Sequence, residues 1–219
     1  MNPRRTTWGL AVLLLAMSWL PACLGGSPPP LVLKWTLEYP PPHLEGARTL
    51  PVVMRVERFS ATAALGGQEM IYRPASNQRQ SYPYQQWWAA PSDLVGDLLL
   101  RDLQASGLFE GVLAYDQQGR PRYRLEGGVR EFLEVDDPQG WRARLWVNLA
   151  LVDSADPHLP GRILLQKDYR LEEPIADKGA AGLAAAMSRA TRRFSRRALA
   201  DIYQALARAV KKDAAAAKD

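Results

Sequence analysis

The clearest structural pattern in the sequence is Trp141-Arg142-Ala143-Arg144-Leu145-Trp146-Val147-Asn148-Leu149-Ala150-Leu151. Every second position carries an apolar side chain: Trp141, Ala143, Leu145, Val147, Leu149 and Leu151. Three polar residues, Arg142, Arg144 and Asn148, occupy the alternate positions. Because successive side chains of a strand point to opposite faces, this pattern predicts a long strand with one packed face and one wetter face.

Two further stretches repeat the alternation on either side of this strand. Tyr123, Leu125 and Val129 precede it, and Ile163, Leu165, Tyr169 and Leu171 follow it after a loop rich in proline and aspartate. The pair Gly127-Gly128 predicts a bulge in the first of these strands. Three consecutive strands of this kind predict an antiparallel meander.

Two helices are predicted. Pro91 is suited to the first turn of a helix, apolar residues continue to Leu103, and Gly107 ends the pattern. The second helix covers about residues 178–211 and is rich in alanine, with Met187, Phe194 and Ile202 on its apolar stripe. Shorter strands are predicted at 33–39, 51–59, 70–72, 80–84 and 111–115. The predicted fold class is therefore α+β, a mostly antiparallel sheet with two helices packed on one face.

The N-terminus predicts export and a lipid anchor. Arg4 and Arg5 precede an apolar stretch of about a dozen residues, which is too short for a membrane span of roughly 20 residues. The stretch ends at Leu20-Pro21-Ala22-Cys23, which resembles a bacterial lipobox and predicts acylation of Cys23. An ordinary signal peptide with an incidental cysteine is the alternative. Leu24, where a retention signal for the inner membrane would place aspartate, favours the outer membrane.

These signals divide the chain into four parts. Residues 1–22 are the predicted signal peptide, and 23–32 form a lipidated tether whose Gly25-Gly26-Ser27-Pro28-Pro29-Pro30 run is flexible and extended. Residues 33–212 form one domain, and 213–219 a disordered tail.

Charge and composition exclude some classes of function. The net charge of +5 becomes +3 when Arg4 and Arg5 are removed with the signal peptide, since the signal carries no acidic residue. This mild basicity does not argue for nucleic acid, and an exported lipoprotein is a poor candidate for it. Cys23 is the only cysteine, so the domain has no disulfide.

The sequence predicts no enzyme. Its two histidines, His43 and His158, lie among prolines in predicted loops, without a nucleophile or metal-ligand partner nearby in sequence. HExxH, CxxC and phosphate-binding glycine motifs do not occur in it. We therefore expect no catalytic residue, no metal and no cofactor other than the acyl lipid on Cys23.

Two segments are candidates for contact with a partner or with lipid. The first is the aromatic segment Tyr82-Pro83-Tyr84-Gln85-Gln86-Trp87-Trp88, because Tyr and Trp suit such interfaces. Its candidate residues are Tyr82, Tyr84, Trp87 and Trp88. The alternative is that one tryptophan fills the core and the others cover the sheet, and both interpretations can hold together.

The second candidate is an arginine cluster on the last helix. Arg189, Arg193 and Arg196 have i, i+4, i+7 spacing and therefore share a helix face. This face suits anionic lipid headgroups or an acidic partner. The alternative is an ordinary solvated surface opposite Met187 and Phe194.

Several segments in order resemble the ABC-type transport auxiliary lipoprotein family, the PqiC-like proteins. They are Trp35–Pro40, Met70–Arg73, Tyr82–Pro91 with Leu99–Leu103 and Ser106–Phe109, Tyr123–Gly127 with Val129–Phe132, and Ala185–Ala190. The resemblance implies a component of a system in which an ABC permease, its ATPase and an MCE-domain protein move lipid between membranes. By this resemblance the protein is anchored to the outer membrane, faces the periplasm and docks the MCE assembly.

Two other functions stay open at this point. A periplasmic scaffold or activator of cell-wall (peptidoglycan) assembly has a similar tethered design, and a direct lipid carrier would hold lipid in its own cavity. A buried apolar pocket would favour the carrier, whereas a filled core with an exposed aromatic or basic patch would favour docking.

Overall fold

The computed structural model describes residues 30–138, 140–155, 157–158 and 162–216. The chain divides into two units, Met1–Leu31 and Val32–Asp219, and every helix and strand described below lies in the second. The predicted signal peptide and most of the predicted tether lie outside the described residues.

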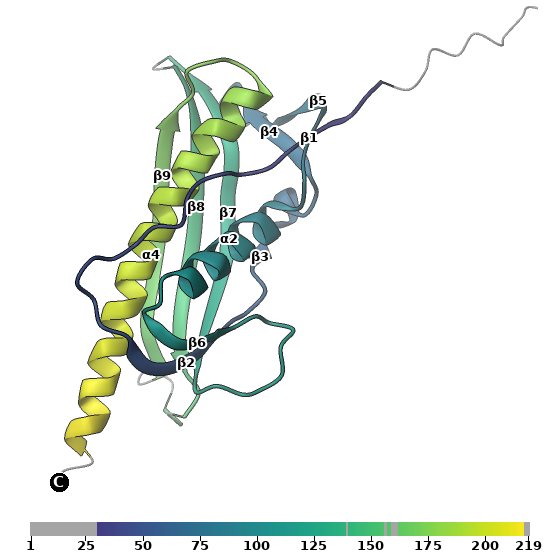
Figure 1. The fold of residues 1–219 in the computed structure, drawn as a ribbon. Coiled ribbons are helices and arrows are strands. Elements are labelled where there is room, and N and C mark those ends of the chain that lie inside the picture. Colours follow the sequence, from purple (N-terminus) through teal and green to yellow (C-terminus); the bar gives the residue numbers. More distant parts are fainter. Residues whose placement is uncertain (1–29, 139, 156, 159–161, 217–219) are drawn as a thin grey trace, which may run out of the picture. The chain divides into compact units, whose positions relative to one another are not determined.

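The described elements are nine strands, two α-helices and one 3₁₀ turn (Figure 1). The strands are β1 (Leu33–Trp35), β2 (Leu50–Val56), β3 (Ser60–Ala61), β4 (Glu69–Arg73), β5 (Gln80–Trp87), β6 (Phe109–Leu113), β7 (Tyr123–Asp137), β8 (Gly140–Asp153) and β9 (Ile163–Pro174). The helices are α2 (Pro91–Ala105) and α4 (Ala180–Ala216), and the 3₁₀ turn η1 covers Ala63–Leu65. Residues 213–216, which the sequence assigns to the tail, are helical, and Asp213 accepts a hydrogen bond from Arg122 at 2.6 Å.

The predicted meander is present. β7, β8 and β9 pair antiparallel in sequence order, with Val147 of β8 opposite Val129 on one side and Tyr169 on the other. Ala143, Leu145, Val147, Leu149 and Leu151 are fully buried. The opposite face carries ion pairs: Arg144 contacts Glu172 at 2.7 Å and Glu131 at 3.8 Å.

The rest of the sheet corrects the predicted topology. The far edge of β7 pairs in turn with β2, β3 and β4, and all three run parallel to it. Among the described strands, five pairs are parallel and three are antiparallel, so the sheet is mixed and the prediction of a mostly antiparallel sheet was wrong. Alternation indicates a strand but not the direction of its neighbour, and these neighbours are far apart in sequence.

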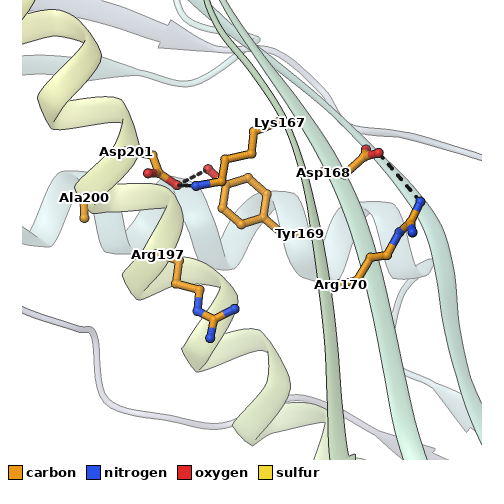
Figure 2. Close-up of a pocket in the computed structure, with 7 residues that line it drawn as sticks. All are labelled: Lys167, Asp168, Tyr169, Arg170, Arg197, Ala200 and Asp201. Carbon is orange, nitrogen blue, oxygen red and sulfur yellow. Dashed lines mark hydrogen bonds and ion pairs between the residues drawn. The ribbon is translucent and has the colours of Figure 1, made fainter.

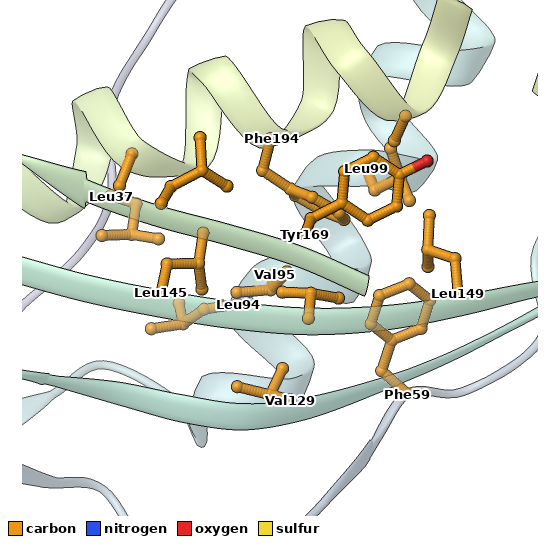
Figure 3. Packing of buried hydrophobic residues seen from close by; sticks show 14 of the residues in the cluster. Leu37, Phe59, Leu94, Val95, Leu99, Val129, Leu145, Leu149, Tyr169 and Phe194 are labelled. Atoms are coloured by element: carbon orange, nitrogen blue, oxygen red, sulfur yellow. The ribbon is translucent and has the colours of Figure 1, made fainter. Parts of the chain in front are cut away.

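Both helices cover the same face of the sheet, as predicted (Figure 1). α2 packs on β6 and β7, and α4 packs on β8 and β9, while the two helices contact each other. Figure 3 shows Phe194 of α4 beside Tyr169 of β9, and their ring centroids are 5.3 Å apart. Burial of a large apolar side chain of this kind stabilises a fold by about 1.5–3 kcal/mol.

Gly127 makes room for an aromatic side chain instead of forming the predicted bulge. The register shift lies between Val129 and Glu131. A Cβ on Gly127 would lie 2.3 Å from Phe59, and one on Gly96 of α2 would lie 3.2 Å from the same ring. The Phe59 ring is therefore held between the sheet and α2, which both glycines allow to approach closely.

Replacing Gly127 with alanine should lower the free energy of unfolding by about 1–3 kcal/mol, because the buried Phe59 ring has to move. Urea unfolding of the purified protein measures this loss. Gly66→Ala is the control, since Gly66 is exposed and its nearest contact would be 3.5 Å away. Equal stability of the two variants would show that the Phe59 ring is not tightly held.

The segment between β1 and β2, residues 36–49, crosses the helix layer, and we call it the strap (Figure 1). Leu37 is buried, and the Glu38 amide donates to Ser188 Oγ of α4 at 3.1 Å. Near its end, Arg48 O accepts a hydrogen bond from Tyr203 of α4 at 2.9 Å. The predicted strand 33–39 therefore stops after Trp35, because the following residues bond to the helices, with Glu38 bonded to α4 and Tyr39 to α2.

Candidate functional site

The aromatic segment lies on β5 and at its end, and the structure divides it between core and surface. Trp87 is fully buried and meets Phe132 of β7 edge to face, with ring centroids 4.9 Å apart. Trp88 is 66% exposed. Adjacent strand residues point to opposite faces, so the two indoles have different surroundings.

The two tyrosines of the segment also differ. Tyr82 donates a hydrogen bond to Glu134 at 2.7 Å, and the pKa of Tyr82 is raised by burial and by this carboxylate. Burial also raises the pKa of Glu134, while the hydrogen bond from Tyr82 opposes that rise. Tyr84 is 56% exposed. Of the four predicted contact residues, only Tyr84 and Trp88 therefore present large exposed surfaces.

The arginine cluster of α4 lies on its exposed side, and its members differ in their partners. Arg193 pairs with Glu173 of β9, and Arg189 lies 3.6 Å from the same carboxylate and donates to Pro174 O at 2.7 Å. Within the described part of the chain, the exposed side chain of Arg196 makes no ion pair or side-chain hydrogen bond. The same holds, among the described residues, for its neighbours Arg192 and Arg197.

We call Arg192, Arg196 and Arg197 the free arginines of α4. Their guanidinium groups are hydrated and can exchange water for carboxylate or phosphate oxygens. Arg189 and Arg193 are already committed to Glu173, so a partner would have to compete for them. The helix thus offers a basic surface, but only part of it coincides with the predicted Arg189, Arg193 and Arg196.

A depression of about 760 Å³ on the surface is lined by residues of α4 and of the edge strand β9 (Figure 2). Asp201 accepts hydrogen bonds from Lys167 Nζ and Tyr169 OH, both at 2.8 Å, and burial together with Asp201 raises the pKa of Tyr169. Figure 2 shows Arg197 on the same helix as Asp201, while Arg170 and Asp168 form a separate pair. This depression is open and charged. Lys167 and Tyr169 already donate to the Asp201 carboxylate, so this carboxylate is not available to activate a nucleophile.

A buried polar cluster between the helices was not predicted from the sequence. Asp102 of α2 is fully buried and accepts from Arg101 at 2.7 Å and from Tyr39 OH of the strap at 2.9 Å. Ser195 of α4 also donates to it, and the Arg101 guanidinium lies 4.6 Å from the Tyr39 ring centroid. Burial and the nearby Asp102 carboxylate raise the pKa of Tyr39. One signal could have revealed the cluster: Val95, Leu99 and Asp102 share a helix face by i, i+4, i+7 spacing.

The chemistry of this cluster is that of a hydrogen-bonded link between segments of the chain, not of a catalytic site. Ser195 and Asp102 could belong to a hydrolytic triad, but His43 and His158 both lie on exposed loops. Every partner of Asp102 donates to it, so the carboxylate is satisfied by a cation and two hydroxyls. The cluster therefore joins the strap, α2 and α4.

The His, Cys, Asp and Glu side chains of the described residues do not converge in a group of three that could hold a metal ion. Among the same residues, neither α-helix is long and apolar enough to cross a bilayer.

Comparison with solved structures supports the fold. A crystal structure of a DUF330-family protein from Xanthomonas campestris is similar, with a TM-score of 0.74 and 18% identity, over 82% of this chain and 99% of that chain. A protein described as uncharacterized has a TM-score of 0.62 and 13% identity, over 79% of this chain and 99% of its own. At these identities the likeness concerns the fold alone.

Sequence comparison gives the family. A search of the curated proteins finds no match. Residues 35–198 match the family model described as ABC-type transport auxiliary lipoprotein component. The match begins in β1 and ends within α4, so it includes the meander, α2 and the buried Asp102 cluster. The chain therefore belongs to the family of ABC-type transport auxiliary lipoproteins.

Proposed function

We propose that the protein is a periplasmic lipoprotein, anchored to the outer membrane through acylated Cys23, in a system that moves lipids between inner and outer membranes. In this role it docks an MCE-domain protein that works with an ABC permease and its ATPase, and it catalyses no reaction itself. The family match over residues 35–198 is the observation that carries this proposal. The resemblance of the ordered motifs to PqiC-like proteins supports its MCE and lipid-transport parts.

The packing of the domain favours docking over a lipid-carrying role. Trp87, Phe132 and Phe194 fill the space between sheet and helices and are almost completely buried. The surface depressions beside β9 and beside the strap open to solvent and carry charged side chains. A carrier needs an enclosed apolar volume for acyl chains, whereas a docking module needs a rigid body with exposed contact residues.

The free arginines of α4 are the docking surface that we propose, together with the predicted face of Arg189, Arg193 and Arg196. An acidic surface on the MCE partner would replace water around Arg192, Arg196 and Arg197 without breaking an existing ion pair among the described residues. Contacts of this kind guide association and set specificity. The domain's tether would raise the local concentration of this surface near the membrane.

Reversing the charge of Arg196 should reduce docking. We expect Arg196→Glu in the full-length protein to lower recovery of a crosslinked MCE-domain partner from the envelope at least tenfold, because it places a carboxylate against an acidic surface. Quantitative affinity purification after crosslinking measures the recovery. The control is Arg170→Glu, an equal change of charge on exposed β9, where Arg170 stacks on Trp146.

Two results would contradict the proposal. If the unmodified protein recovers cell-wall synthesis enzymes and no MCE-domain protein, it is a scaffold or activator of peptidoglycan assembly. If Arg196→Glu and Arg170→Glu lower recovery equally, the effect is one of net charge and α4 is not the docking surface.

A further inference from the structure

We propose that the sheet edge formed by β1 and β5 rests on the lipid bilayer, with Trp88 and its apolar neighbours in the headgroup layer. This inference rests on the acyl anchor of the proposed function. It adds a second, noncovalent contact with the membrane that fixes how the domain is oriented.

Exposed apolar side chains gather at this edge. Val32 is 42% exposed, Leu33 44%, Tyr84 56% and Trp88 66%, and we call these four the edge patch. Leu33 lies opposite Gln85 in the parallel β1–β5 pair, and the Trp88 amide extends the pairing by donating to Trp35 O at 2.7 Å. Other exposed large apolar residues of the described domain, Val53, Tyr115 and Ile163, lie on other strands or loops. A cluster of this kind on an otherwise charged surface marks an interaction site.

The backbone of β5 is strained where it presents Tyr84. This residue has a φ of 57°, and among the described residues it is the only one other than glycine with a positive φ. A left-handed conformation is unfavourable for a residue with a Cβ. Such strain persists where the surroundings impose it and is commonest at functional positions. Here it accompanies a tyrosine that is mostly in solvent.

A basic side chain borders the edge patch. Lys34 Nζ lies 5.7 Å from the Trp88 ring centroid. Tryptophan and tyrosine are enriched at the membrane–water interface, and Lys and Arg side chains are attracted to its anionic headgroups. The patch thus combines the two kinds of side chain that a phospholipid headgroup layer favours.

The edge patch lies close in sequence to the proposed lipid anchor, which favours the bilayer as the surface that it contacts. Val32 lies nine positions after Cys23. A fully extended chain of nine residues spans at most about 30 Å. Among the described strands, β1 therefore has the shortest tether to the proposed anchor. Because the tether keeps the effective concentration of the surface high, a weak contact is enough to orient the domain.

Site-directed spin labelling of the full-length, acylated protein tests this contact. Cys23 is the only cysteine, and in the proposed lipoprotein its thiol carries the acyl lipid, so an introduced cysteine can be labelled alone. Trp88→Cys and Val32→Cys place a nitroxide in the edge patch, and Trp146→Cys places one on β8, away from the β1–β5 edge, where Arg170 covers Trp146. The protein is reconstituted in vesicles of phosphatidylethanolamine and phosphatidylglycerol, and vesicles recovered by flotation are measured by power-saturation EPR.

We expect both patch labels to collide at least about fivefold less often with a water-soluble nickel relaxer than the label at 146, while oxygen reaches them. This corresponds to the depth of about 5–10 Å at which interfacial side chains lie. Unchanged circular dichroism shows that the variants fold. Val32→Cys keeps the Trp88 indole, so its result does not depend on the loss of that side chain.

Flotation tests the acyl anchor, and nickel accessibility tests the contact of the edge patch with the bilayer. If the protein fails to float with the vesicles, the acyl anchor is wrong and the inference falls with it. If the protein floats but both patch labels are as accessible to nickel as the label at 146, the inference alone is overturned. Shielding of the patch labels that requires a purified MCE-domain protein would also overturn it, because the patch would then be a protein contact.

Discussion

Replacing Asp102 with alanine should lower the free energy of unfolding by about 3–5 kcal/mol, the loss expected when one partner of a buried charge network is removed. Asp102 is fully buried and accepts from Arg101, Tyr39 and Ser195, which lie on α2, the strap and α4. Without the carboxylate, the hydroxyls of Tyr39 and Ser195 lose their partner in the interior. Urea unfolding of the purified protein measures the loss.

Asp97→Ala is the matched control, because Asp97 lies on the same helix but is exposed. We expect it to change stability by no more than about 0.5 kcal/mol. Asp102→Ala should also make the strap more accessible to proteases, since Tyr39 is one of its attachments. A loss at Asp102 no larger than that at Asp97 would show that the polar cluster does not tie the strap to the helices.

Replacing Cys23 with alanine should release the protein from the membrane almost completely. Acylation would add about 0.8 kcal/mol of membrane affinity for each buried CH₂ group, so the loss of all acyl chains removes the dominant attraction. The edge patch by itself would bury only a few side chains and would not retain the domain. Metabolic labelling with an alkyne fatty acid and fractionation of envelope from soluble periplasm measure both steps.

Trp88→Ala is the control for this experiment. It leaves Cys23 and the tether intact, so we expect full acyl labelling and full retention in the envelope. If Cys23→Ala stays in the envelope as strongly as the unmodified protein, the lipoprotein interpretation of Leu20–Cys23 is wrong.

Local patterns of the sequence were enough to predict the meander and the two helices. The alternation from Trp141 to Leu151 has a period that only a strand fits. β8 buries Ala143, Leu145, Val147, Leu149 and Leu151, whereas Trp141 is only partly buried. Pro91 and Gly107 bracket α2, and Gly107 has a φ of +65°, the conformation that favours glycine after a helix. Signals of this kind depend on residues a few positions apart, so they can be read without tertiary contacts.

Pairings between distant segments could not be predicted in the same way. The parallel pairing of β2, β3 and β4 with β7 joins residues up to about seventy positions apart, such as Met54 with Tyr123. The route of the strap depends on Ser188 and Asp102, which lie far beyond it in sequence. The Gly127-Gly128 pair indicated an irregular strand, but Phe59, which decides its role, comes from another part of the chain.

The candidate contact residues show the same division. The sequence identified the aromatic segment and the arginine helix because both are local concentrations of one chemistry. In the structure, Trp88 and Tyr84 are exposed, whereas Trp87 and Tyr82 are more buried. Glu173 forms ion pairs with Arg189 and Arg193 but not with Arg196. The presence of a neighbour across the fold decides whether a side chain is available to a partner.

By itself, the sequence determined the α+β class and the positions of the main strands and helices, and it carries the patterns on which we propose an export signal and a site of acylation. These follow from periodicity, capping and short motifs, which act over one or two turns of chain. Only the tertiary structure decided the direction of the short strands, the burial of Asp102 and the gathering of Val32, Leu33, Tyr84 and Trp88 at one edge. Those features arise when distant segments compete for the same core, and the free energy of that packing has no local signature in the chain.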